Sequence, residues 1–169
     1  MALFKKKPKT EPKTEPKPVP VAVKKESYDF IAKCDNEKSQ KALEKYQKFW
    51  TDPEDKYNGM KLMEFKNEGV PGDKVYQYPP LDVDVRLEAF LPEDGSDPNV
   101  TVYLLNGDEE IRVGTAAKTK AKKIIKLCSE NNPKIAGELY GGKYWKMEDS
   151  GYVDDRWTED LTVRVYLEY

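Results

Sequence analysis

The chain has 169 residues, carries a formal net charge of −2 and contains no histidine. This length is typical of one compact domain, and the lack of histidine excludes Ser-His and Cys-His catalytic pairs and histidine zinc sites. No apolar run approaches the roughly 18 residues of a membrane span, no signal peptide is visible, and two cysteines cannot form a disulfide framework. We therefore expect a cytoplasmic protein that does not bind a membrane.

The first 25 residues differ in composition from the rest. They hold eight lysines against two glutamates, a charge of +6, so the remaining residues carry −8, the difference between −2 and +6. Proline recurs every fourth residue from Pro8 to Pro16, which blocks helix and ladder hydrogen bonds alike. Residues 1–25 are therefore predicted to be a disordered basic arm and residues 26–169 the folded domain. The arm either adds affinity for nucleic acid or an acidic partner, or only keeps the protein soluble.

The folded part is predicted to begin with a strand and a helix. Residues 28–32 alternate with a period of two, and Asp35 or Asn36 can cap the helix that follows. The helix carries five apolar residues at helical spacing, a stripe that we expect to face the core: Ala42, Leu43, Tyr46, Phe49 and Trp50. Residues 52–80 are rich in proline and glycine and are predicted to be mostly loop, with short, extended pieces at 61–65 and 75–78.

A strongly β-like region follows. Val83, Val85 and Leu87 share one side of a predicted strand at 82–88. After a turn, apolar runs at 100–105 and 110–113 flank Asn106-Gly107, a pair that favours a hairpin because both residues tolerate positive φ.

The C-terminal part is predicted to contain a second helix and the last strands. Thr115 can cap a helix at 116–130, whose buried stripe includes Cys128 as a small core hydrophobe. Further strands are predicted at 135–140, 144–146 and 161–169. The pattern favours an α+β, mainly β fold in which about six antiparallel strands form a small barrel or a strongly bent sheet with two flanking helices.

Motifs for catalysis are weak. Neither a GxGxxG nor a P-loop pattern occurs, and residues 93–97 lack the ligand spacing of a calcium loop. Asp82 and Asp84 share one strand face, which suits a metal or an acid/base pair, although such a pair is more often simply solvated. We expect no cofactor and no enzymatic activity, and a metal-dependent hydrolase using these two aspartates is the least favoured hypothesis.

Features for binding are stronger. Lysines line the polar side of the second helix, and aromatic residues recur near Tyr140, Tyr144, Trp145, Tyr152 and Trp157. Lysines that follow phosphates and rings that stack on bases are the elements of single-strand recognition. The alternative is a solvated helix face and rings packed in a sheet. Because the folded part is acidic, a nucleic-acid site would have to be local.

The central region resembles the HIRAN domain family. The resemblance rests on Arg86 to Tyr103, with Asp97-Pro98-Asn99 before a strand, on Val113-Gly114 before a helix, and on Gly141-Gly142-Lys143-Tyr144. It covers about residues 80–145 and implies a small SH3- or OB-like β-barrel, bacterial stand-alone relatives and a site for single-stranded DNA ends. The chain departs from the family pattern at Ser96, where an aromatic residue is expected, and at 115–117.

The leading hypothesis is a non-enzymatic module that binds single-stranded DNA or DNA ends. We expect Asp97 and Asn99 to bind sugar or terminal hydroxyls. Cations would bind phosphates, the candidates being Arg86, Lys118, Lys122 and Lys126. The competing hypothesis is a protein-interaction or structural adaptor with no nucleic-acid ligand.

Overall fold

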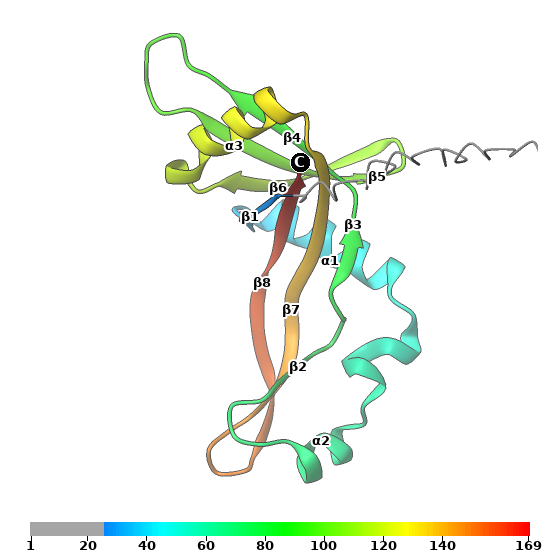
Figure 1. Ribbon diagram of the computed structural model, residues 1–169. Helices are drawn as coiled ribbons and strands as arrows, with labels where there is room; N and C mark the ends of the chain where they lie inside the picture. Colours follow the sequence, from blue (N-terminus) through cyan, green and yellow to red (C-terminus); the bar gives the residue numbers. More distant parts are fainter. Residues whose placement is uncertain (1–25) are drawn as a thin grey trace, which may run out of the picture.

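The computed structural model describes residues 26–169, so the expectation of a disordered arm concerns residues outside the described part. The described chain forms eight strands, three α-helices and one 3-10 helix (Figure 1). In chain order these elements are β1 (Ser27–Cys34), α1 (Glu37–Trp50), η1 (Pro53–Gly59), α2 (Leu62–Glu68), β2 (Lys74–Tyr76), β3 (Leu81–Val83), β4 (Val85–Phe90), β5 (Asn99–Asn106), β6 (Glu109–Ala116), α3 (Lys118–Asn131), β7 (Lys134–Met147) and β8 (Val153–Glu168).

All strands belong to one antiparallel sheet. The strand order is β2-β7-β8-β1-β6-β5-β4, and β3 also pairs with β7. Asp84 alone separates β3 from β4. These two consecutive strands nevertheless pair with different parts of the sheet, β3 with β7 and β4 with β5. The fold is therefore mainly β, as expected. The ladder is not a closed barrel, because no pairing joins β4 to β7 within residues 26–169, and it has eight strands where six were expected.

The main core lies on one face of the bent sheet. Its fully buried side chains come from β1, β5, β6, β7, β8 and both long helices, among them Phe30, Leu43, Leu104, Ile124, Leu139 and Leu167. In strands, apolar residues alternate with polar ones, which places the apolar set on this face. The helix α3 packs against β5, and α1 packs against β6 and β8.

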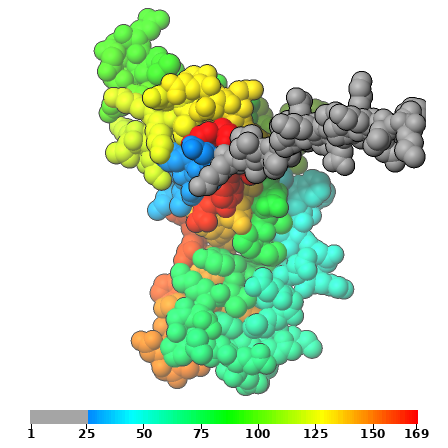
Figure 2. All heavy atoms as spheres, viewed as in Figure 1, coloured from blue at the N-terminus to red at the C-terminus, as the bar shows by residue number. Residues whose placement is uncertain are grey.

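The strands β7 and β8 extend beyond this core as a long hairpin (Figures 1 and 2). A second, smaller core covers one face of the extension and consists of Phe65, Val75, Trp145, Met147 and Val153. The ring of Tyr57 from η1 stacks on Trp145, with 3.7 Å between centroids and 7° between planes. The segment with η1 and α2 therefore covers only this face of the hairpin.

Several predicted elements are confirmed. The strand at 28–32 lies in β1, and Asn36 caps α1 by accepting a 2.8 Å hydrogen bond from the Ser39 amide. The hairpin of β5 and β6 forms as expected. Its turn residues are Gly107 and Asp108, because Asn106 already pairs with Glu109 at the end of the ladder.

Two predictions about helices were wrong. Residues 61–65, expected to be extended, lie mostly in α2, whose Phe65 enters the small core. Thr115 does not cap α3, because it is still in β6, paired with Lys33 and Thr101, and the N-cap position is Ala117.

The stripe on α1 is shifted from the predicted one. Leu43 is buried, but Phe49 is 78% exposed and Trp50 56% exposed. The buried positions of the helix are Ser39, Leu43 and Gln47 instead. The helix therefore turns a polar side chain, Gln47, toward the sheet and two aromatic side chains toward solvent. Within residues 26–169, no helix is long and apolar enough to cross a membrane.

Candidate functional site

The uncovered face of the β7–β8 hairpin carries a cluster of aromatic and charged side chains. We call this the aromatic face and define it by Tyr76, Tyr144 and Trp157 with Lys74 and Lys146. Pairing between strands explains the cluster, because Tyr76 and Trp157 are both partners of Tyr144. Directly paired residues point to the same side of a sheet.

The rings of this face contact one another. Trp157 is parallel to Tyr144 within 18°, with 6.5 Å between centroids, and Tyr76 is tilted against Tyr144 at 5.3 Å. Tyr144 is only 4% exposed, whereas Trp157 is 42% exposed. The indole thus lies beside a buried ring of similar orientation and presents its outer part to solvent.

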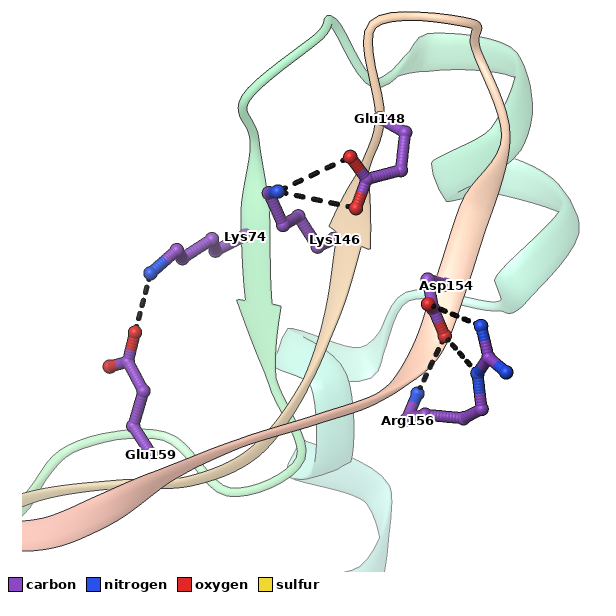
Figure 3. A network of polar contacts seen from close by, with 6 residues as sticks. All are labelled: Lys74, Lys146, Glu148, Asp154, Arg156 and Glu159. Atoms are coloured by element: carbon purple, nitrogen blue, oxygen red, sulfur yellow. Dashed lines mark hydrogen bonds and ion pairs between the residues drawn. The ribbon is translucent and has the colours of Figure 1, made fainter.

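Two lysines flank the rings. Lys74 Nζ lies 4.8 Å from the Tyr144 centroid, and Lys146 Nζ lies 4.8 Å from the Trp157 centroid, distances typical of cation–π contacts. Each lysine also has a carboxylate partner (Figure 3). Lys74 pairs with Glu159 at 2.5 Å, and Lys146 pairs with Glu148 at 3.2 Å.

Hydrogen bonds fix the carboxylate of Glu159 between two donors. The Tyr76 hydroxyl donates to its second oxygen at 2.6 Å. The bonds from Lys74 and Tyr76 lower the pKa of Glu159, and burial together with Glu159 raises the pKa of Tyr76. The face therefore holds a fixed ionised carboxylate and a neutral phenol at neutral pH.

A β-bulge lies directly beside the aromatic face. The register between β7 and β8 shifts between Tyr140 and Gly142, and both Gly141 and Gly142 have positive φ, at +105° and +88°. A Cβ on Gly141 would also lie 2.7 Å from the Asp160 carbonyl oxygen. Bulges of this kind bend strands and are common next to binding sites.

Shallow depressions surround this bulge. One of about 190 Å³ is lined by Tyr76, Tyr78, Tyr140 and Arg164, and a larger one of about 470 Å³ on the side of α1 shares Tyr78 with it. The Arg164 guanidinium lies 5.8 Å from the Tyr140 ring centroid. The aromatic face thus continues into a groove at the bulge.

The residues proposed from the HIRAN-like motif lie elsewhere. Asp97 is exposed in the loop between β4 and β5, and Asn99 is half-buried at the start of β5, opposite Phe90. The structure records no side-chain hydrogen bond between them within residues 26–169. Their position is that of a turn before a strand, which Asp-Pro-Asn favours by itself.

Arg86 is already engaged by other side chains. Its guanidinium makes two 2.7 Å hydrogen bonds to Glu110 and lies 4.4 Å from the Tyr103 ring centroid. A phosphate would have to compete with this bidentate carboxylate.

The three lysines proposed on α3 share one exposed face of that helix. Lys118, Lys122 and Lys126 are four residues apart, and Lys126 lies 3.9 Å from Glu130. Within residues 26–169, the ion pairs of Arg86 and Lys126 are with Glu110 and Glu130, so no shared acidic partner links the lysines of α3 to Arg86.

The predicted aromatic residues separate into two groups. Tyr140, Tyr144 and Trp157 come together around the outer face of the hairpin, whereas Trp145 points to the opposite side and enters the small core. Sequence reasoning missed Tyr76, Lys74 and Glu159, because no local pattern shows that residues 74–76 pair with β7.

Metal binding finds no support in the arrangement of acidic groups. Asp82 lies in β3 and Asp84 connects β3 to β4, and both are exposed. Within residues 26–169, no three histidine, cysteine or acidic side chains come together as a metal site would require.

Comparisons with known proteins add no relative: no protein-family model, curated protein or solved structure matches the chain.

Proposed function

We propose that the protein binds single-stranded nucleic acid on the aromatic face of the β7–β8 hairpin. The observation that supports this most is the half-exposed Trp157, which lies beside the buried Tyr144, with a lysine ammonium near each ring. A partly exposed ring of this kind is a stacking platform for a base, and a neighbouring phosphate would have to compete with Glu159 and Glu148 for the two lysines. The resemblance of the bent sheet to a HIRAN-like, SH3- or OB-like fold remains part of this proposal.

The charges on this face favour a weak, stacking-dominated interaction. Lys74 and Lys146 both have carboxylate partners, so neither is a free cation. A duplex hides its bases and presents mainly phosphates, whereas a single strand exposes the base faces. We therefore expect single strands to bind more tightly than duplexes of the same length.

Fluorescence anisotropy with a labelled single strand tests the proposal. Stacking on one ring contributes about 1–3 kcal/mol, so Trp157→Ala should weaken binding about tenfold. Trp50→Ala is the matched control, because Trp50 is similarly exposed but lies on α1. The proposal is wrong if Trp157→Ala binds as tightly as the unmodified protein.

A variant with alanine at Lys118, Lys122 and Lys126 distinguishes the two locations for the site. On this proposal the triple variant retains most of its affinity, because the lysines lie on α3 and not on the hairpin. Loss of binding in the triple variant, with normal binding by Trp157→Ala, would place the site on α3 instead.

A protein-interaction adaptor is the second candidate. Phe49 and Trp50 are exposed side by side at the end of α1, with their rings edge to face at 5.2 Å. Paired exposed aromatic residues are frequent at protein interfaces. This candidate is favoured if no oligonucleotide binds at low salt and a stable protein partner is lost with Phe49→Ser.

A further inference from the structure

The smaller depression beside the bulge, of about 190 Å³, has an aromatic lining with two charged groups. We call it the tyrosine pocket, and its side chains are those of three tyrosines, a proline, a carboxylate and an arginine: Tyr76, Tyr78, Tyr140, Pro80, Glu138 and Arg164. Pockets for drug-sized ligands enclose about 300–1,000 Å³. The tyrosine pocket is smaller and therefore suits a single planar ring, which can lie against the tyrosines.

The tyrosine pocket adjoins the aromatic face on the same side of the hairpin. Tyr76 belongs to both, because its ring is tilted against Tyr144 at 5.3 Å and also lines the pocket together with Tyr140. Glu159, which accepts hydrogen bonds from Lys74 and Tyr76, borders a further depression with Tyr140. A strand stacked on the aromatic face can therefore reach the pocket without crossing the sheet.

The two charged groups of the pocket are not paired with each other. Glu138 and Arg164 are direct partners across β7 and β8, an arrangement that brings opposite charges within reach of each other. Within residues 26–169, however, Arg164 makes no ion pair, whereas every other arginine of this part binds a carboxylate. Glu138 instead accepts a 3.2 Å hydrogen bond from the Tyr166 hydroxyl. One unpaired cation beside one unpaired anion favours a neutral ligand that has both acceptors and donors.

Both charged side chains present polar atoms to the pocket. Each lines it and is partly exposed. Of the three guanidinium nitrogens of Arg164, only Nε is buried without an acceptor within residues 26–169. A ligand would therefore meet the two terminal nitrogens. On Glu138, the Tyr166 hydroxyl occupies Oε2 and leaves Oε1 for a ligand.

We propose that the tyrosine pocket binds a guanine of a strand held on the aromatic face, an inference that rests on the proposed function. Guanine presents two adjacent acceptors, O6 and N7, which match the two terminal nitrogens of Arg164. Its N1–H and N2 amino donors would face the Glu138 carboxylate, on an edge that a single strand leaves open. Adenine carries an amino group in place of O6, and a pyrimidine covers less of the tyrosine rings.

The test uses the full chain and labelled thymine strands of one length, each with a single guanine at a different position. In fluorescence anisotropy, at least one guanine position should bind about tenfold more tightly than the all-thymine strand, the effect of one good base contact. Adenine or cytosine at that position should not give this gain. Trp157→Ala should weaken every strand but keep the ratio between them.

Two variants test the contacts in the pocket. Arg164→Met removes the donors, and Glu138→Gln keeps an acceptor for Tyr166 but removes the charge, so each should abolish the guanine preference. Arg156→Met is the matched control, because Arg156 also lies on β8 but binds Asp154, and it should keep the preference. All three positions are at least partly exposed, so the variants should fold, which their urea denaturation midpoints check.

The outcomes separate this inference from the proposed function. If the unmodified protein binds all strands equally, if adenine or cytosine gives the same gain, or if either pocket variant folds and keeps the guanine preference, the pocket does not select guanine, although the proposed function stands. If no strand binds at all, the proposed function and this inference both fail.

Discussion

Val83 and Val85 belong to strands at opposite ends of the sheet order, yet their side chains pack over the same residue, Gly137 of β7. A Cβ on Gly137 would lie 2.7 Å from Val85 Cγ1 and 3.1 Å from Val83 Cγ2. The glycine thus lets β4 approach β7 although no ladder joins them.

Substitution of Gly137 tests this contact. Gly137→Ala should lower the free energy of unfolding by about 1–3 kcal/mol, the usual cost of overpacking a core. Gly114→Ala should cost more, because its Cβ would overlap the backbone carbonyl of Lys33, which cannot rotate away. Urea denaturation measures the free energy of unfolding of both variants. The control is Thr115→Ala at an exposed neighbouring position, whose stability should lie within about 0.5 kcal/mol of that of the unmodified protein. A Gly137→Ala protein of unchanged stability would contradict the close approach of the strands.

The shifted stripe of α1 predicts which of its apolar residues stabilise the fold. Leu43→Ala should cost about 2–5 kcal/mol, because the leucine is fully buried in the main core. Phe49→Ser should change stability by no more than about 0.5 kcal/mol, because the ring is exposed. Thermal or urea unfolding of the two variants checks this. A large loss with Phe49→Ser would mean that the ring is covered in solution.

The small core of the hairpin is predicted to unfold separately from the main core. Phe65→Ala removes its central helix residue and should raise the hydrogen-exchange rates of α2 and β2 amides. Amides of β1 and β6, which surround the main core, should keep their protection. Equal loss of protection in both regions would show that the two cores unfold as one unit.

The hydrogen-bonded carboxylate of Glu159 predicts a pH dependence. Its pKa in the folded protein lies below the ordinary value of 4.5, mainly because Lys74 donates a hydrogen bond to it. The resulting stabilisation is present above the unfolded-state pKa and is lost as the pH falls through the folded-state pKa. Glu159→Gln should therefore cost less than about 1 kcal/mol at pH 7, since the pair is partly exposed.

The same stability difference should disappear in acid, once Glu159 is protonated in both states. Urea denaturation of the two proteins from pH 7 to pH values below 4.5 measures it. A stability difference that persists unchanged in acid would show that the substitution acts through packing and not through charge.

Local pattern was sufficient to predict the β5–β6 hairpin and the start of α1, because a turn residue and a capping residue each act over a few positions. It was not sufficient for β7 and β8. Gly141-Gly142 indicates a break, but the positive φ of both glycines carries the strand through a bulge. The last strand was predicted to begin at residue 161, yet pairing with β7 extends β8 back to Val153.

The candidate site was predictable only in part. Aromatic residues at Tyr140, Tyr144 and Trp157 were recognised as candidates for stacking, and the structure places them around one face. The burial of Gln47 depends on the rotation of α1, which the apolar stripe misjudged by counting Phe49 and Trp50 as buried. Tertiary contacts decided that rotation. Among the side chains of α1, Leu43 is the only large apolar one that is fully buried in the main core.

The position of β1 between β6 and β8 makes completion of the sheet depend on distant parts of the chain. Ala32 pairs with both Ala116 and Val163. The long chain segments between these residues must therefore close into loops before β1 can form backbone hydrogen bonds along either edge. Folding should therefore be slow for a domain of this size. A fragment that ends before β8 would leave β1 and β7 with open edges, and such edges recruit strands from other molecules and lead to aggregation.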